Sequence, residues 1–314
     1  MELFKICMIG MGSIGARHLK NIVAVLKEQG KAYAIDVVRS GNGKELDGDV
    51  AEHVNQIFWS YDEVPDDYDV IFVTNPTHLH FETVQQFVKK TKHMFIEKPV
   101  FHTTEVLLDE LRLKCGSVYY VACPLRYTDV IQYLKYQCNL KNAFSVRSIC
   151  SSYLPEWRPG QDYRDSYSAH KDQGGGASID LIHEWDYLCY LFGEPEQVFN
   201  LQGTISNLEI DSDDLSLYIA KYANMTVEVH LDYFGRKTIR EIQIFTDEDT
   251  IVGDLTKSEI RYLKSGKIIS FGEQRNDFQR KEISHFFDII EGRSPNDNDI
   301  LKAIRTLQVA KEGK

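Results

Sequence analysis

The chain has 314 residues, of which 43% are hydrophobic and 26% charged, the composition of an ordinary globular protein. This length predicts two domains, because single hydrophobic cores stop growing at roughly 250–300 residues. A net charge of −11 with scattered Lys and Arg argues against a nucleic-acid partner, which needs a basic surface.

Other partners and locations are also restricted by the sequence. No apolar stretch approaches the roughly 20 residues that span a bilayer, so we expect no membrane partner. The N-terminus lacks a signal-peptide pattern, which favours a cytoplasmic location. The cysteines lie far apart without a CxxC pair, so neither a metal site nor disulfides are expected.

The first part of the chain alternates predicted strands and helices. Apolar runs typical of strands lie at 3–9, 32–38, 69–76, 93–99 and 118–122. Helical patterns follow the first and third of these runs, and another covers 103–115. This βαβ alternation predicts a doubly wound parallel sheet, a Rossmann domain, over residues 1–123.

From Pro124 onward the pattern changes. Helices are predicted near 128–138 and over 178–192, a strand near 143–152, and closing helices near 276–291 and 298–311. Residues from about 196 to 271 are almost all strand-like with short turns, which indicates an antiparallel sheet. We expect 124–314 to form an α+β domain with a large open, mainly antiparallel sheet. Its uncovered face predicts a homodimer or homotetramer.

The segment "GMGSIG" fits the dinucleotide-binding pattern G-x-G-x-x-G. It follows a predicted strand and opens a predicted helix, the context in which backbone N–H groups receive a pyrophosphate. The residues expected to bind the cofactor here are Gly10, Gly12, Ser13, Ile14 and Gly15.

The end of the second strand decides between NAD and NADP. Asp36, 21 residues after Gly15, has apolar neighbours and precedes the strand end by about two positions. Arg39 and Ser40 stand where the strand should stop. An arginine there binds the 2′-phosphate of NADP, whereas an acid would bind the ribose 2′-OH of NAD. The sequence therefore favours NADP over NAD.

Polar residues also follow two later strands of the predicted Rossmann sheet. "NPTHLH" contributes Asn75, Pro76 and His80, and "EKP" contributes Glu97 and Lys98. Doubly wound sheets bind ligands at the carboxyl ends of their strands, so these residues are expected at the cofactor. Lys98 could donate or accept a proton there. The alternative is a surface lysine paired with Glu97.

"GGGASIDLIHEWD" places glycines before a dense group of titratable residues. On a continuous helix over 178–192, Asp180, His183 and Tyr187 share one side with the neighbouring acids, and the apolar residues mostly share the other. This side lacks Lys and Arg, although solvated helices usually mix charges. Either it is an ordinary solvated face, or it receives a substrate that the glycines allow to approach.

The stretch 153–173 has no periodicity but many aromatic and basic residues. Long loops of this kind are usually functional, aromatic rings stack on sugars, and guanidinium groups bind carboxylate or phosphate. A lid or a subunit contact is the alternative. Candidate substrate-binding residues, including two outside the loop, are Arg126, Tyr153, Trp157, Arg158, Tyr163, Arg164, Tyr167 and Tyr187.

The combination of G-x-G-x-x-G, N-P-T-x-x-H, E-K-P and a GGG…D…H-x-x-D segment resembles the Gfo/Idh/MocA oxidoreductases over essentially the whole chain. The resemblance implies an NAD(P)-dependent dehydrogenase or reductase acting on sugars, with Lys98 near the nicotinamide. It also implies that Asp180 and His183 contact the substrate. The usual spacing between this Asp and His is four residues, whereas "DLIH" has three.

The expected reaction is hydride transfer between the dinucleotide and a hydroxyl or carbonyl of a sugar-type small molecule. In it Lys98 contacts the reacting oxygen, His183 relays the proton, and Asp180 orients them. The "YLPEWRPGQDYR" run resembles the branch found in bacterial surface-glycan and nonulosonic sugar pathways, which implies an amino-sugar or nucleotide-linked substrate. Two alternatives stay open: an inactive dinucleotide-binding regulator, and a reductase like dihydrodiol dehydrogenase or biliverdin reductase.

Overall fold

The computed structural model describes residues 3–41 and 45–312. The chain forms two compact units, Met1–Ala122 with Gln279–Ile304, and Cys123–Phe278 with Arg305–Lys314. The predicted boundary between 123 and 124 lies one residue from the observed one. The assignment of all later residues to the second domain was wrong, because 279–304 returns to the first unit.

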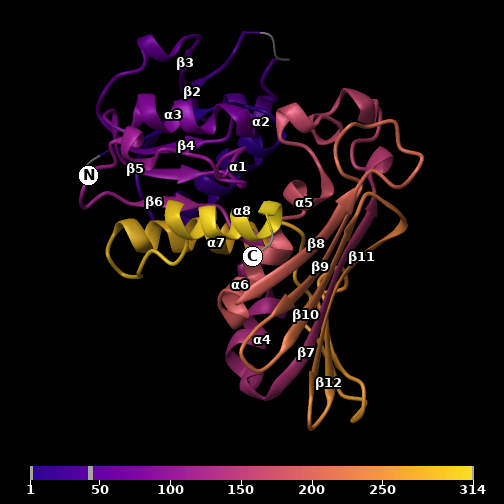
Figure 1. The fold of residues 1–314 in the computed structure, drawn as a ribbon. Coiled ribbons are helices and arrows are strands. Elements are labelled where there is room, and N and C mark those ends of the chain that lie inside the picture. The colour runs from indigo at the N-terminus through magenta and orange to yellow at the C-terminus, as the bar shows by residue number, and fades with distance from the viewer. Residues whose placement is uncertain (1–2, 42–44, 313–314) are drawn as a thin grey trace. The chain divides into compact units, whose positions relative to one another are not determined.

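The first unit is built on a parallel sheet with the strand order β3-β2-β1-β4-β5-β6 among the described residues (Figure 1). The strands are β1 (Phe4–Ile9), β2 (Tyr33–Val38), β3 (Val54–Phe58), β4 (Tyr68–Val73), β5 (Thr91–Ile96) and β6 (Tyr119–Val121). This is the order of a doubly wound dinucleotide-binding sheet, and it confirms the predicted Rossmann fold. Strand β3 was not predicted, since its largely exposed residues carry no apolar run.

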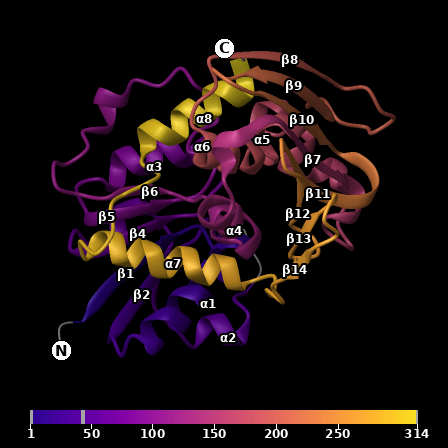
Figure 2. The same cartoon turned by 90° about the horizontal axis from the view of Figure 1, so that it is seen from below.

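The helices of the first unit are α1 (Ser13–Glu28), α2 (Gly48–Ala51), α3 (His80–Phe87) and α7 (Asp277–Ile290). Figure 2 shows α7 alongside the sheet. The ring of Phe287 on α7 lies 5.8 Å from Phe4 of β1, and Phe286 lies 5.4 Å from Phe95 of β5. These aromatic contacts explain why the late helix belongs to this unit rather than to the second.

The helix predicted over 103–115 does not form. The structure has only a 3-10 turn at Leu108–Leu111, after which Arg112 takes a left-handed conformation. Within the segment Leu111 is buried, but Leu107 is 68% exposed. The helix was predicted from helical spacing alone. Helices in proteins are stabilised mainly by packing of an apolar face, and this segment buries no such face.

The second unit contains a mixed, mainly antiparallel sheet, which confirms the predicted α+β fold. Its order among the described residues is β14-β13-β12-β11-β7-β10-β9-β8, and Figure 2 shows these strands side by side. Among the strand pairs of this sheet in the described residues, only β7–β10 is parallel. The strands are β7 (Ala143–Tyr153), β8 (Gln197–Gly203), β9 (Leu215–Lys221), β10 (Thr226–Asp232), β11 (Phe234–Thr246), β12 (Thr250–Asp254), β13 (Glu259–Tyr262) and β14 (Ile268–Ser270).

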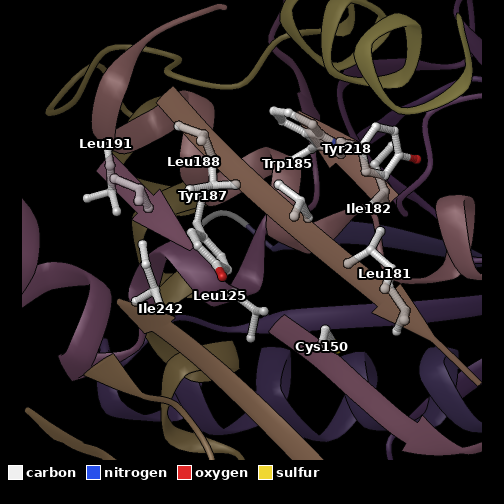
Figure 3. Packing of buried hydrophobic residues seen from close by; sticks show 14 of the residues in the cluster. Leu125, Cys150, Leu181, Ile182, Trp185, Tyr187, Leu188, Leu191, Tyr218 and Ile242 are labelled. Carbon is white, nitrogen blue, oxygen red and sulfur yellow. The ribbon is translucent and has the colours of Figure 1, made fainter. Parts of the chain in front are cut away.

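Helices cover one face of this sheet and form the core of the second unit. They are α4 (Asp129–Gln137), α5 (Ala177–Asp180) and α6 (His183–Phe192), while α8 (Ile300–Glu312) is divided between the units after Ile304. Figure 3 shows Trp185 of α6 beside Tyr218 of β9, their ring centroids 5.2 Å apart. Both side chains are essentially buried, so this contact anchors α6 on the sheet. In the described part of the chain, no helix is long and apolar enough to cross a membrane.

Candidate functional site

The ends of β1 and β4 lie at the point where the strand order of the first unit reverses. Gly10 follows β1 with a φ of +95°, and a Cβ there would lie 2.7 Å from the Cα of Asn75. Thr74 Oγ1 donates a hydrogen bond of 2.7 Å to the Gly10 carbonyl. Only glycine fits this turn, which brings the two strand ends together at the place where such sheets bind dinucleotides.

The other two glycines of the fingerprint have different surroundings. A Cβ on Gly15 would lie 2.4 Å from the Gly10 carbonyl oxygen, whereas a Cβ on Gly12 would meet nothing within 4 Å. Gly12 is the N-cap of α1; within the described chain no side chain caps this end, and the first turn carries no acid. The open backbone N–H groups and the helix dipole therefore fit a dinucleotide pyrophosphate. Ser13 and Ile14 form the first turn, as predicted.

We expect Gly15→Ala to lower the free energy of unfolding by at least about 2 kcal/mol, because the added methyl group overlaps a backbone carbonyl. Gly12→Ala should cost less than about 1 kcal/mol, yet weaken NADPH binding at least about tenfold by filling the space that a phosphate needs. Urea denaturation and fluorescence titration check the pair. Equal destabilisation by both variants would contradict this division of roles.

The ribose-selecting position lies at the end of β2. Asp36 is inside the strand, where it accepts hydrogen bonds from Tyr68 Oη at 2.6 Å and from Asn55 Nδ2 at 2.8 Å. Arg39 directly follows the strand, with its guanidinium 6.0 Å from the ring centroid of Trp59. Ser40 is exposed beside it. Asp36 is therefore held within the sheet, and Arg39 and Ser40 are the residues at the strand end.

His80, predicted to bind the cofactor, contacts backbone carbonyls of the protein. Its side chain is buried, with Nε2 3.0 Å from the Asn75 carbonyl and Nδ1 3.1 Å from the carbonyls of Pro99 and Val100. Burial lowers its pKa, although the backbone contacts oppose this. His80 thus links the loops after β4 and β5 instead of reaching a ligand. Pro76 is exposed in the first of these loops.

Asn75 and Glu97 support these same loops. Asn75 donates through Nδ2 to Thr83 Oγ1 at 2.7 Å, and its buried Oδ1 accepts no hydrogen bond from the described residues. Glu97 is buried in an ion pair with His18 of α1, and it also accepts the backbone N–H of Lys98 at 3.1 Å. Burial alone would raise the pKa of Glu97, but His18 and Lys98 together outweigh it and the pKa is lowered. Glu97 therefore positions the loop that carries Lys98, and its contact with the cofactor stays a prediction.

The predicted continuous helix over 178–192 is broken. It ends at Asp180 as α5, turns through Leu181 and Ile182, and restarts at His183 as α6. The glycines before it contact the protein itself. A Cβ on Gly175 would lie 2.3 Å from the Tyr167 carbonyl oxygen, and one on Gly176 would lie 2.2 Å from Asp213 Oδ1. They permit close packing of the chain rather than clearing space for a ligand.

Asp180 lies in a buried polar cluster of the second unit. It accepts a hydrogen bond of 2.7 Å from Tyr233 Oη, and it also interacts with the hydroxyl of Tyr167. The negative charge of Asp180, together with burial, raises the pKa of Tyr167. Both phenols therefore stay protonated as donors, and they hold the Asp180 carboxylate in one orientation.

The acids of α6 are not solvated, because arginines from other elements pair with them. Glu184 is fully buried and lies 2.9 Å from Nε of Arg240 on β11. Asp186 accepts two hydrogen bonds, of 2.9 and 2.7 Å, from the buried Arg126. Arg126 is thus part of an internal bidentate pair rather than an open substrate ligand.

Tyr187 was predicted to bind substrate, but its side chain is fully buried among the core residues of Figure 3. Its hydroxyl is 2.7 Å from Ser148 Oγ. His183, by contrast, is half-buried at the first position of α6. Of the three predicted catalytic residues, Asp180 and His183 belong to the second unit and Lys98 to the first.

The loop 153–173 is ordered by a series of 3-10 turns. Trp157 packs edge-on against Tyr233, with ring centroids 5.1 Å apart, and donates to Ser152 Oγ at 2.9 Å. Tyr163 Oη accepts the backbone N–H of Glu209 at 3.1 Å. A small pocket is lined by residues of this loop, among them Trp157, Arg158 and Tyr163.

The arginines of the loop differ in their partners. Arg164 binds Asp162 at 2.6 Å and Glu209 at 2.7 Å, contacts that fasten the loop, and its substrate role stays a prediction. Arg158 instead lies over the ring of Tyr167 at 5.2 Å. Tyr153 carries the guanidinium of Arg236 over its ring at 3.8 Å.

Several residues of these clusters were not predicted from the sequence, chiefly His18, Tyr233, Arg236 and Arg240. His18 is in the helix that the glycine fingerprint opens, at a buried helical position, and a polar residue on such a face was a detectable signal. The others lie on strands far along the chain, and their partners depend on strand pairing.

Two family profiles match the sequence. One, described as "Oxidoreductase family, NAD-binding Rossmann fold", matches residues 4–112, and the "GFO/IDH/MocA C-terminal domain" matches 144–252. The chain belongs to the Gfo/Idh/MocA family of oxidoreductases. Together with the glycine turn, this identifies residues 4–112 as the NAD-binding Rossmann fold of that family.

Two curated relatives of this Gfo/Idh/MocA protein are 28% and 21% identical to it over the aligned residues. The 2,7-anhydro-N-acetylneuraminate hydratase of Escherichia coli (strain K12) is 28% identical over 142 residues, 44% of this chain and 38% of that one. The uncharacterized oxidoreductase YrbE of Bacillus subtilis (strain 168) is 21% identical over 94% of this chain and 84% of its own. The alignment with the hydratase thus spans well under half of that protein.

Among solved structures, levoglucosan dehydrogenase in complex with NADH and levoglucosan has a TM-score of 0.82. Its identity is 19%, with 98% of this chain and 96% of that chain covered. At this identity the likeness establishes the shared fold of the Gfo/Idh/MocA protein.

Proposed function

We propose that this Gfo/Idh/MocA protein transfers a hydride between a nicotinamide dinucleotide and a hydroxyl or carbonyl group of a sugar or sugar derivative. The glycine turn is the observation that carries the proposal. Close contacts leave no room for a side chain at Gly10 or Gly15, whereas the space around Gly12 is empty and adjoins an uncapped helix N-terminus. The levoglucosan complex of a structural neighbour supports a sugar as the substrate class. A bound nicotinamide supplies or accepts the hydride.

Three side chains are proposed to serve the reaction. Lys98 contacts the reacting oxygen and gives or takes its proton. The buried Glu97–His18 pair holds the loop of Lys98 and so fixes where this side chain starts. His183 relays the proton, since imidazole titrates near neutral pH and this side chain is half-buried rather than enclosed. Asp180 positions the substrate or its neighbours, because two phenols fix its carboxylate.

Substrate screening tests the proposed activity. Purified protein with NADP or NAD is mixed with neutral, amino- and nucleotide-linked sugars, and nicotinamide absorbance is followed. We expect turnover with a sugar derivative and none without it. The name of the E. coli relative, which refers to an N-acetylneuraminate derivative, supports including nonulosonic sugars. Oxidation of apolar dihydrodiols alone would contradict the proposal.

The cofactor is proposed to be NADP rather than NAD, because Arg39 follows β2 while Asp36 is held by Tyr68 and Asn55. Arg39→Ala should weaken NADPH binding about 10–100-fold, because it removes a charge-assisted hydrogen bond to the 2′-phosphate. NADH binding should be unchanged, because NADH lacks this phosphate. Parallel fluorescence titrations check this, with NADH as the internal control. Equal affinity of the native protein for both, or tighter binding of NADH, the dinucleotide bound in a solved neighbour, contradicts it.

The outer face of the second sheet is proposed to form a homodimer or homotetramer. Phe199 and Leu201 of β8 are 61% and 68% exposed, and they pair in register with Ile219 and Leu217 of β9. An apolar patch of this kind is a typical subunit contact. Leu201→Asp should yield monomers in sedimentation analysis. Leu107→Asp, at an equally exposed leucine of the first unit, should leave the oligomer intact, and equal effects would contradict the proposal.

A further inference from the structure

Two arginines of the second unit differ from the others around them. Most arginines of this acidic chain lie against carboxylates, as Arg164 does with Asp162 and Glu209. Arg158 and Arg236 contact tyrosine rings, and the described part of the chain provides neither with a carboxylate within ion-pair distance. In a protein of net charge −11, two such cations call for an explanation.

Stacking orients both guanidinium groups. Arg236 lies 3.8 Å from the ring centroid of Tyr153, and Arg158 lies 5.2 Å from that of Tyr167. A guanidinium on an aromatic face keeps its N–H donors at its edges, where they are available to a planar or tetrahedral oxyanion. The rings therefore limit the rotamers of both arginines before any ligand binds, which reduces the entropy lost on binding.

The two arginines lie in stretches that are joined at one end of the sheet. Leu154 donates its backbone N–H to the Tyr233 carbonyl at 2.8 Å, and Phe234 pairs in register with Tyr153. The Trp157 ring contacts Tyr233 as well. Arg158 is next to Trp157, and Arg236 is two residues beyond Phe234. In Figure 1 this is the end of β7 and the start of β11, near the uppermost loops of the second unit.

The surroundings of the two arginines carry charges of both signs. Arg158 lines the small pocket of the loop, together with Trp157. Of the acids in this region, Asp162 and Glu209 bind Arg164, and Asp232 is paired with His230. Arg158 and Arg236 themselves, rather than a net positive charge of the region, therefore favour an anion.

We propose that Arg158 and Arg236 form a subsite for an anionic group, a carboxylate or a phosphate, on the substrate. The inference rests on the proposed function and adds to it the class of substrate: a sugar derivative that carries a negative charge. Tyr153 and Tyr167 position the two guanidinium groups, and charge-assisted hydrogen bonds from them hold the anion.

Binding of three related probes tests the subsite. Glucose, glucuronate and glucose 1-phosphate are titrated into the native protein with the dinucleotide held constant, and intrinsic fluorescence is followed, since Trp157 lies next to Arg158. We expect at least one anionic probe to bind about tenfold or more tighter than glucose. Whichever of glucuronate and glucose 1-phosphate binds more tightly shows whether the subsite prefers a carboxylate or a phosphate. Dinucleotide affinity is measured separately, so loss of cofactor binding, which would remove the proposed function, is distinguishable from loss of the subsite.

Matched variants complete the test. Arg158→Gln and Arg236→Gln should each weaken the preferred anion about 10–100-fold and leave glucose binding unchanged. Arg305→Gln is the control, because Arg305 is an exposed arginine of the same unit that is paired with Glu194. Thermal melting verifies that each variant is folded. No preference for either anion, no binding of any probe, or an anion preference that survives the double variant would overturn the proposal.

Discussion

Lys98→Met is expected to lower kcat about 10²–10⁴-fold, the usual contribution of a positioned proton-transfer group, while the Kd of the dinucleotide stays the same. Methionine keeps the length and apolar stem of the side chain but has no proton to give. The loop itself should persist, because Glu97 is bound to His18 and accepts the backbone N–H of residue 98, which the substitution leaves in place. Stopped-flow and steady-state kinetics separate the chemical step from cofactor binding.

Lys92→Met serves as the matched control for this prediction. Lys92 lies on β5, a few residues before Lys98, and its ammonium group is paired with Asp69 at 2.7 Å on the surface. The control should retain native kcat. Similar losses in both variants, or a loss of less than about tenfold in Lys98→Met, would show that Lys98 does not take part in the reaction.

Asp186→Asn is expected to reduce the free energy of unfolding by about 3–5 kcal/mol, because it leaves the buried Arg126 without its carboxylate. The two side chains are 11% and 6% exposed and share two hydrogen bonds. Urea denaturation followed by tryptophan fluorescence measures the loss, since Trp185 is the neighbouring residue on α6.

An exposed ion pair provides the comparison for Asp186→Asn. Asp49 binds Lys20 on the surface of the first unit, where the two side chains are 78% and 46% exposed. Asp49→Asn should leave the free energy of unfolding nearly unchanged, because water screens such pairs. If Asp186→Asn were as mild as Asp49→Asn, the Arg126–Asp186 pair would not stabilise the fold.

The glycine turn of the Rossmann fold was predictable because its residues are close in sequence. The three glycines, the strand before them and the helix after them form one local unit, and the contacts of Gly10 and Gly15 explain the pattern directly. The position of Arg39 likewise follows from where a single strand ends. A sequence pattern is sufficient where the structure it describes is local.

The region around Asp180 was harder to predict because its environment is assembled from distant strands. The acids of 180–186 resembled a solvated or ligand-binding face, since their partners Arg126 and Arg240 lie more than fifty residues away in the chain. The same holds for the glycines at 175 and 176, which contact Tyr167 and Asp213. Helical periodicity cannot reveal the break after Asp180, because tertiary contacts determine it.

Transfer of the hydride itself is the most direct measurement of the central claim. The protein is incubated with dinucleotide deuterated at the reactive carbon of its reduced nicotinamide and with an oxidised sugar derivative, and the sugar is analysed by mass spectrometry. The account predicts deuterium bound to carbon in the sugar product, and its loss in Lys98→Met. Dinucleotide binding without transfer of deuterium to any sugar derivative would contradict the proposed oxidoreductase.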